Sequence, residues 1–224
     1  MNSEFQGKRE YADSEEQKIF AGRLFCPADP ELVQMKLKSH KLSQKYSSLG
    51  EDETEERETV IKEMIGSFGE GSFIQGPVFF HYGVHTSIGD NCFFNYNLTI
   101  QDDARVSIGD NNNFGPNFTV VTPVHPLIAS ERNAMLDPDG NVKHLCYARP
   151  VNIGNSCWFG AGVTVCPGVT IGDNVVIGAG SVVTRDIPSD VFAAGVPCRV
   201  IRRITEDDSI MYKPEISEGC RPTL

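Results

Sequence analysis

Residues 150–188 read PVNIGNSCWFGAGVTVCPGVTIGDNVVIGAGSVVTRDIP, and this stretch carries a strict six-residue period. The residues in the period are apolar and follow one another without a break: Ile153, Phe159, Val165, Ile171, Ile177 and Val183. A six-residue period fits neither an α-helix nor a long single strand. It is typical of a solenoid in which short strands alternate with tight turns. The stretch therefore predicts a β-solenoid whose periodic side chains point inward and stack on their equivalents in the next coil.

The same period recurs upstream and extends the solenoid back to about residue 72. One set comprises Ile88, Phe94 and Ile100, and a second comprises Ile108, Phe114 and Val120. The step from Ile100 to Ile108 is eight residues, so we expect two inserted residues at that turn. Glycine follows many of the periodic residues. We expect glycine or asparagine there to tolerate the backbone conformation that a corner requires.

The segments around the repeat divide the chain into three parts. Residues 1–70 are predicted to be helical, since Ser14 and Gln17 have the spacing of a capping box and Asp29 precedes a first-turn proline. Apolar residues over 60–68 also have helical spacing. Residues 71–204 hold the repeat, and 205–224 form a tail with few apolar residues. Inside the repeat the period lapses over 123–150, which predicts a protruding loop.

Composition excludes several classes of protein. The net charge of −10 argues against an extended nucleic-acid surface, which needs a basic excess. No apolar run reaches the length of about 18 residues that spans a membrane. The first residues lack the apolar core of a signal peptide, so we expect a cytoplasmic protein. The seven cysteines show no zinc or disulfide spacing, and we expect reduced thiols.

Histidines are the first candidates for chemistry. His125 lies where the period lapses, and an imidazole can accept a proton at neutral pH. The alternative is a loop histidine without a task. His81 and His85 are four apart, and a strand-like coil would place both on one side. A zinc site would need a third ligand, for which His125 is the only candidate. His40 and His144 are expected at the surface.

Two further groups of polar residues have both a functional and a structural interpretation. Four of them lie about one coil before His125 and could bind a polyhydroxylated ligand or satisfy their own corner backbone: Asn95, Asn97, Asp102 and Asp103. Four arginines near the end of the repeat could meet the phosphates of a cofactor or offset the acidic tail: Arg185, Arg199, Arg202 and Arg203.

Several motifs resemble those of the galactoside and maltose O-acetyltransferases, and the galactoside enzymes more closely; the resemblance covers nearly all of the chain. They are AGRLF (21–25), FFNYNLTIQDDARVSIGDN (93–111), VVTPVHP (120–126), the stretch 150–188 quoted above, and AAGVPCRVIRRI (193–204). The resemblance implies a mainly β protein, a left-handed parallel β-helix of hexapeptide repeats with a small N-terminal helical segment. It also implies a homotrimer with active sites between subunits, and acetyl transfer from acetyl-CoA to a hydroxyl of a galactoside, glucoside or maltose-like sugar.

The resemblance also assigns roles to individual residues. His125, in a threonine-x-x-histidine-proline setting, would be the general base for direct attack, with no metal required. The acceptor positions would be Asn95, Asp103, Phe93, Lys36, His81 and Asp29. The positions that line the CoA groove would be Ala161, Trp158, Ala179, Thr184, Arg185, Arg199 and Arg202, with the Ala161 N–H stabilising the developing charge. His81 stands where galactoside enzymes have serine, the 123–150 loop is longer than theirs, and strict alignment places Pro27 rather than Asp29 at the acidic position.

Three alternatives remain open at this point. The acceptor could be an amine or serine instead of a sugar. The chain could be a zinc enzyme similar to γ-class carbonic anhydrases, although it lacks a clean histidine triad. It could also be an inert scaffold, which would need neither His125 nor a basic groove.

Overall fold

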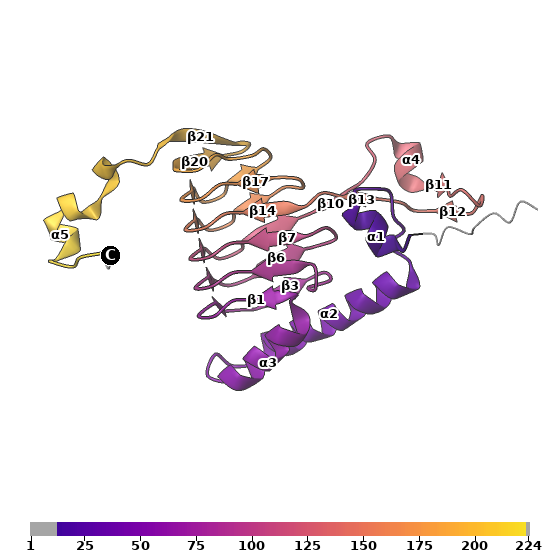
Figure 1. Ribbon diagram of the computed structural model, residues 1–224, viewed down its shortest axis with the longest axis horizontal. Coiled ribbons are helices and arrows are strands. Elements are labelled where there is room, and N and C mark those ends of the chain that lie inside the picture. The colour runs from indigo at the N-terminus through magenta and orange to yellow at the C-terminus, as the bar shows by residue number, and fades with distance from the viewer. Residues whose placement is uncertain (1–12, 223–224) are drawn as a thin grey trace, which may run out of the picture.

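The repeat folds as the predicted left-handed parallel β-helix in a computed structural model, which describes residues 13–222 (Figure 1). Short strands form three faces of a prism. The first face comprises β1 (Ser67–Phe68), β4 (Thr86–Ile88), β7 (Val106–Ile108), β14 (Val151–Ile153) and β17 (Thr170–Ile171). The second comprises β2 (Phe73–Ile74), β5 (Phe93–Phe94), β8 (Asn113–Phe114), β15 (Trp158–Phe159), β18 (Val176–Ile177), β20 (Val191–Gly195) and β21 (Cys198–Arg203). The third comprises β3 (Val78–Phe80), β6 (Leu98–Gln101), β9 (Thr119–Val121), β16 (Thr164–Val165) and β19 (Val182–Val183).

Parallel pairing keeps equivalent residues of successive coils in register. Ile88 pairs with Ile108, Ile108 with Ile153, and Ile153 with Ile171. On the second face the rings of Phe94, Phe114 and Phe159 stack with centroid distances of 4.2 and 4.8 Å. Each of these rings is buried, and burying one phenylalanine stabilises a fold by roughly 1.5–3 kcal/mol. The inward stacking that the period predicts is therefore confirmed.

At the corners of the prism, the glycines have a different role from the one that the sequence predicts. Asn91, Asn111 and Asn174 have φ values of 54°, 58° and 53°, so asparagine does take the left-handed conformation. The glycines directly after the periodic isoleucines do not have positive φ. Instead, a Cβ atom on Gly109 would lie 2.9 Å from the Gly154 carbonyl oxygen of the next coil. These glycines are needed because neighbouring coils approach too closely for a side chain.

Helices α2 (Pro30–Ser48) and α3 (Thr54–Met64) close the N-terminal end of the solenoid, and α1 (Glu15–Phe20) packs beside the prism against residues 147–148 (Figure 1). The Ser14 capping box is present at the start of α1, as the spacing predicts. Helix α3 packs Val60, Ile61 and Met64 into the same core as the coils. Helix α3 ends at Met64, and Phe68 already belongs to β1, so the helix is shorter than the helical spacing over 60–68 predicts.

Segment 123–150 leaves the prism as a protruding excursion (Figure 1). Its base is the antiparallel pair β10 (Pro123–Val124) and β13 (Tyr147–Ala148), and it contains α4 (Ala129–Asn133), β11 (Met135–Leu136) and β12 (Val142–Lys143). After β21 the chain runs away from the prism through 3-10 turns at Glu206–Asp208 and Ile210–Tyr212 to α5 (Pro214–Ser217). Across residues 13–222 no helix has the length and apolarity to cross a membrane, and the cysteines there form no disulfide.

Candidate active site

The predicted site residues lie along two different edges of the prism. The edge between the second and third faces is lined by residues 95–97, 115–117, 160–162 and 178–180, and we name it the alanine edge. The edge between the third and first faces is lined by residues 81–85, 101–105, 122–125, 166–168 and 184–186, and we name it the histidine edge. Asn95, Ala161 and Ala179 lie on the alanine edge. His81, Asp103 and His125 lie on the histidine edge.

A polar cluster forms where helix α2 meets the histidine edge. It consists of Lys36, His40, His81, Tyr82 and Asp103. The His81 Nε2 atom lies 3.9 Å from Asp103 Oδ1, and the His81 ring lies 4.6 Å from that of Tyr82 and 5.7 Å from that of His40. Lys36 and His40 are four residues apart and share one face of α2. The cluster therefore joins three of the predicted acceptor residues, Lys36, His81 and Asp103, with Tyr82, which the sequence did not single out, and with His40, which was expected at the surface but is half-buried.

Two adjacent carboxylates at this edge have different environments. Asp102 is saturated, because the N–H groups of Tyr82 and Gly83 and the hydroxyl of Thr86 donate to it at 2.8, 3.1 and 2.9 Å. Asp103 is equally buried, but its Oδ2 atom has no hydrogen-bond partner within residues 13–222. Burial, together with the negative charge of Asp102, raises the pKa of Asp103 to about 6. A buried carboxylate with a free oxygen is suited to accept a hydrogen bond from a ligand hydroxyl.

The histidines of the cluster are neutral at pH 7. Burial, and then the charge of Lys36, lowers the pKa of His81 to about 4. The same two causes lower the pKa of His40. A neutral imidazole has one donor and one acceptor nitrogen, so each ring can pair with a hydroxyl group. The cluster thus offers hydrogen bonds from uncharged rings beside one lysine and one carboxylate.

His125 lies at the mouth of the protruding excursion, on a cavity of about 290 Å³. The cavity is lined by Pro27, His125, Arg132, Asn133, His144, Leu145 and Cys146. Two backbone hydrogen bonds of 2.8 and 3.1 Å between Phe25 and Cys146 hold the N-terminal segment against the returning strand. The cavity borders the polar cluster at Cys146, whose thiol pKa is raised to about 12 by burial and by the neighbouring Asp103.

Asp29 and His144 have different outcomes at this cavity. Pro27 lines it and Asp29 does not; the Asp29 carboxylate instead accepts from the Glu31 and Leu32 N–H groups at 2.9 and 3.4 Å and caps α2. His144 is exposed, as expected for a surface residue, and it also lines the cavity with His125. Only the return of the chain through β13 brings His144 there, and no spacing in the sequence indicates that return.

The alanine edge exposes backbone donors. Ala161 and Ala179 stand at equivalent corners of successive coils, and their N–H groups have no acceptor in the part of the chain that the structure describes. The Trp158 ring, 58% exposed, lies beside this edge on β15. Phe93 lies on β5, which belongs to the same face as β15, and Asn95 follows that strand at the edge. The free amides and the exposed indole are therefore available to a bound ligand.

The predicted basic residues are distributed over the upper coils. Thr184 and Arg185 lie on the histidine edge, whereas Arg199 and Arg202 lie on β21. Arg202 makes two hydrogen bonds to the Asp208 carboxylate at 2.7 and 2.6 Å. Arg185 makes no ion pair within residues 13–222, so its charge is available to a phosphate. The third face separates Thr184, Arg185 and His125 from Asn95 and the alanine amides, whereas β21 belongs to the second face, and one chain does not bring all of these residues together.

The histidine pair that suggested zinc does not converge. Residues 81–85 form a turn rather than a strand, so the two-residue alternation of side chains does not apply. His85 Nε2 lies 3.0 Å from Glu16 Oε1, and its Nδ1 faces the carbonyl oxygens of Asp102 and Asp103. His85 therefore anchors α1. Within residues 13–222 no three metal-ligating side chains are grouped to hold an ion.

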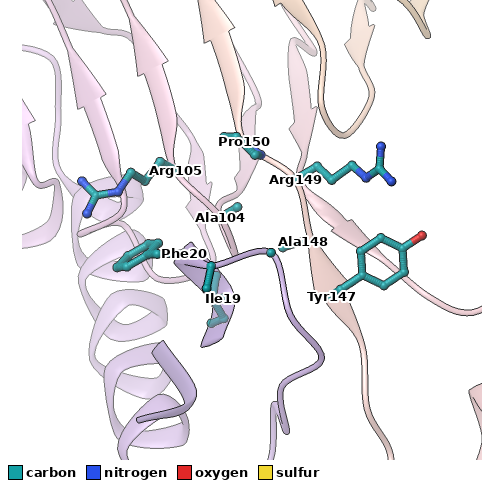
Figure 2. A pocket seen from close by; sticks show the side chains of 10 residues that line it. Ile19, Phe20, Ala104, Arg105, Tyr147, Ala148, Arg149 and Pro150 are labelled. Atoms are coloured by element: carbon teal, nitrogen blue, oxygen red, sulfur yellow. The ribbon is translucent and has the colours of Figure 1, made fainter. Parts of the chain in front are cut away.

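A second cavity, of about 510 Å³, lies between α1 and residues 147–150 (Figure 2). Arg105 and Arg149 point to opposite sides of it, and the Arg105 guanidinium lies 4.3 Å from the centre of the Phe20 ring. No histidine or carboxylate lines this cavity. It offers no group that could accept a proton, and we place the candidate active site at the His125 cavity and the polar cluster.

Comparison with known proteins shows the family to which the chain is similar. Residues 150–185 match the bacterial transferase hexapeptide family (six repeats), and residues 18–69 match the maltose acetyltransferase hexapeptide capping motif. The chain is 44% identical to galactoside O-acetyltransferase of Escherichia coli K12, over 88% of this chain and 92% of that protein.

Solved structures show the same likeness. A galactoside acetyltransferase in complex with coenzyme A superposes with a TM-score of 0.80 at 43% identity, over 88% of this chain and 94% of that one. A maltose O-acetyltransferase from Clostridium difficile 630 gives a TM-score of 0.75 at 37% identity, over 87% of this chain and all of that one. The chain therefore belongs to the galactoside/maltose O-acetyltransferase family of hexapeptide-repeat acetyltransferases.

Proposed function

We propose that this protein transfers the acetyl group of acetyl-CoA to a hydroxyl of a galactoside, glucoside or maltose-like sugar, with His125 as general base. The observation that carries the proposal is Cys146, which lines the His125 cavity and packs in the same buried cluster as Tyr82, so that the cavity meets the polar cluster there. That junction places an exposed imidazole beside buried groups that can bind hydroxyls. The names of the relatives support a sugar acceptor.

The chemistry needs a base because a sugar hydroxyl is too weak an acid to attack a thioester unaided at pH 7. His125 takes the hydroxyl proton as the new C–O bond forms, which contributes about 10²–10⁴-fold. The thioester carbonyl oxygen gains negative charge, and the free N–H of Ala161 stabilises it. The C–S bond then breaks, and the imidazolium returns the proton to the departing thiolate. No covalent intermediate with the protein forms.

The acceptor is bound by the residues of the histidine edge, with contributions from the alanine edge. Asp103 accepts a hydrogen bond from an acceptor hydroxyl, and Lys36 and His81 flank it. Asn95 and Phe93 complete the acceptor site from the alanine edge of a neighbouring chain. CoA contacts Trp158, Ala161, Ala179, Thr184, Arg185, Arg199 and Arg202. Asp29 has its carboxylate engaged at the α2 cap, so its predicted contact to the acceptor requires that cap to open.

We propose a homotrimer with active sites between subunits, and the separation of the two edges supports a site shared between chains. His125 and Ala161 lie on opposite sides of the third face, and a second chain must supply one of them. Mixed trimers test this. H125A and A161P, the latter lacking the N–H, should each be inactive alone, and co-refolded mixtures should recover activity. No recovery from mixtures shown by mass spectrometry to contain both chains would refute the shared site.

The base assignment is tested with H125A and its matched control H144A, since both imidazoles line one cavity. We expect H125A to lower kcat by about 10²–10⁴-fold with little change in the KM of acetyl-CoA. H144A should have a much smaller effect. Near-normal transfer by folded H125A, or a greater loss in H144A, would show that His125 is not the base.

The acceptor class is tested by following thiol release from acetyl-CoA with galactosides, glucosides, maltose and amino sugars. We expect release with at least one of these sugars, and an acetyl ester in the product. Release only with an amine, and none with any sugar hydroxyl, would overturn the sugar assignment.

A further inference from the structure

Unpartnered polar atoms gather in one part of this molecule. Four buried side-chain nitrogen or oxygen atoms of residues 13–222 lack a hydrogen-bond partner, and three of them belong to the polar cluster: His40 Nε2, Tyr82 OH and Asp103 Oδ2. The fourth is Arg57 Nε, beneath the helical cap. Burying such an atom without a partner costs roughly 1–3 kcal/mol, so proteins rarely bury several together without a use for them.

The three atoms belong to side chains that touch one common neighbour, His81. Its ring centroid lies 5.7 Å from that of His40 and 4.6 Å from that of Tyr82, and its Nε2 atom lies 3.9 Å from Asp103 Oδ1. The His40 ring also packs at 4.8 Å against Phe79, which is partly exposed on β3. His40 therefore enters the cluster from α2, opposite the coil residues, and forms a wall of the acceptor site.

We propose that His40 determines acceptor specificity, by hydrogen bonding through Nε2 to one particular hydroxyl of a polyhydroxylated sugar ring held by Asp103 and Tyr82. This inference rests on the proposed function and extends it to a residue outside the reacting groups. Tyr82 and Asp103 bind neighbouring hydroxyls in the same way. The preferred acceptor is an uncharged pyranose with at least two free hydroxyls besides the one that is acetylated.

The charges of the cluster favour an uncharged acceptor. His40 and His81 are both neutral at pH 7, because burial and the nearby Lys36 disfavour their protonated forms. Lys36 also lies close enough to Asp103 to offset its charge. An anionic ligand would meet the Asp103 carboxylate, and a cationic one would meet Lys36. Hydroxyl groups, which both donate and accept, match the neutral imidazoles and the phenol.

The test uses a series of monodeoxy derivatives of the best sugar acceptor, with wild type, H40F, H40Q and K41A. H40F keeps a ring against Phe79 and His81 but removes the hydrogen bond, whereas H40Q retains a donor and an acceptor. Lys41 is exposed on the same helix and serves as the control. For wild type and K41A we expect one monodeoxy sugar to lose at least about tenfold in kcat/KM.

In H40F the kcat/KM for the parent sugar should fall by a similar factor. The kcat/KM for that same monodeoxy sugar should be the same in H40F as in wild type, because the His40 ring and the missing hydroxyl interact with each other. H40Q should recover part of the loss, and the KM of acetyl-CoA should not change in any variant. If H40F lowers kcat/KM equally for every sugar in the series, or for none, His40 has no role in specificity. Failure of wild type to acetylate any sugar would instead refute the proposed function, and this inference with it.

Discussion

Replacing Asp103 with asparagine should stabilise the unliganded protein while it weakens binding of the acceptor. The Asp103 carboxylate is 3% exposed, its Oδ2 atom has no partner within residues 13–222, and its neighbour Asp102 is also a carboxylate. Such an environment favours the protonated form. The folded protein therefore binds a proton at Asp103 more tightly than the unfolded chain does, and it loses stability as that proton is removed.

The magnitude follows from the pKa. Burial, with the charge of Asp102, raises the pKa of Asp103 from 3.8 to about 6. At a pH above both of these pKa values, the pKa shift lowers the free energy of unfolding by about 3 kcal/mol relative to a neutral side chain. At pH 5, where Asp103 is only partly ionised in the folded protein, the shift lowers it by about 1.5 kcal/mol. D103N removes the ionisation but keeps the shape. Its stability relative to wild type should therefore be about 1.5 kcal/mol more favourable at pH 8 than at pH 5, or about 3–6 °C in Tm.

The assay is thermal and urea unfolding of wild type and D103N at pH 5 and pH 8, at equal protein concentration because an oligomer couples stability to concentration. Comparing the difference between the two proteins at each pH cancels all other titrating groups. The kcat/KM for the acceptor, measured on the same samples, should fall in D103N. An equal stability difference at both pH values would refute the environment assigned to Asp103, and an unchanged acceptor kcat/KM would refute its role in binding.

Four other measurements follow from the same structure. D29A should lower the free energy of unfolding by about 0.5–2 kcal/mol through loss of the α2 cap, while leaving the acceptor KM unchanged; a large rise in KM would restore Asp29 to the acceptor site. F114A should lower the free energy of unfolding, measured with urea, by about 3–5 kcal/mol, because it removes the middle ring of the Phe94–Phe114–Phe159 stack. G109A should cost about 1–3 kcal/mol in the same assay, because its Cβ atom would meet the Gly154 carbonyl at 2.9 Å. Wild-type kcat/KM for the acceptor should rise as the pH passes about 6, where Asp103 ionises, and D103N should show a smaller rise than wild type.

The period in the sequence predicts those features that repeat from coil to coil. It identifies the inward residues, the stacking of Phe94 on Phe114, and the position of the excursion that carries His125, since each depends only on local spacing. It does not predict the contacts made by segments that leave the repeat. His144 reaches His125 only through the β10–β13 pairing, and His40 reaches His81 only because α2 packs on β3. Both contacts join residues distant in sequence, and no periodicity encodes them.

The separation of the site over two edges could have been read from the register alone. His81, Gln101 and Thr184 directly follow the inward residues Phe80, Ile100 and Val183 of the third face. Asn95 and Gly160, next to Ala161, directly follow the inward residues of the second face. Residues at the same offset from the same face must lie on the same edge. The edge that carries His81 and His125 is therefore different from the edge that carries the Ala161 amide. The strand β6 between those edges has four residues, which at about 3.3 Å per residue keeps them more than about 10 Å apart. A proton acceptor and an oxyanion donor must both lie within about 3 Å of the reacting atoms, and this distance therefore supports a site completed by a second chain.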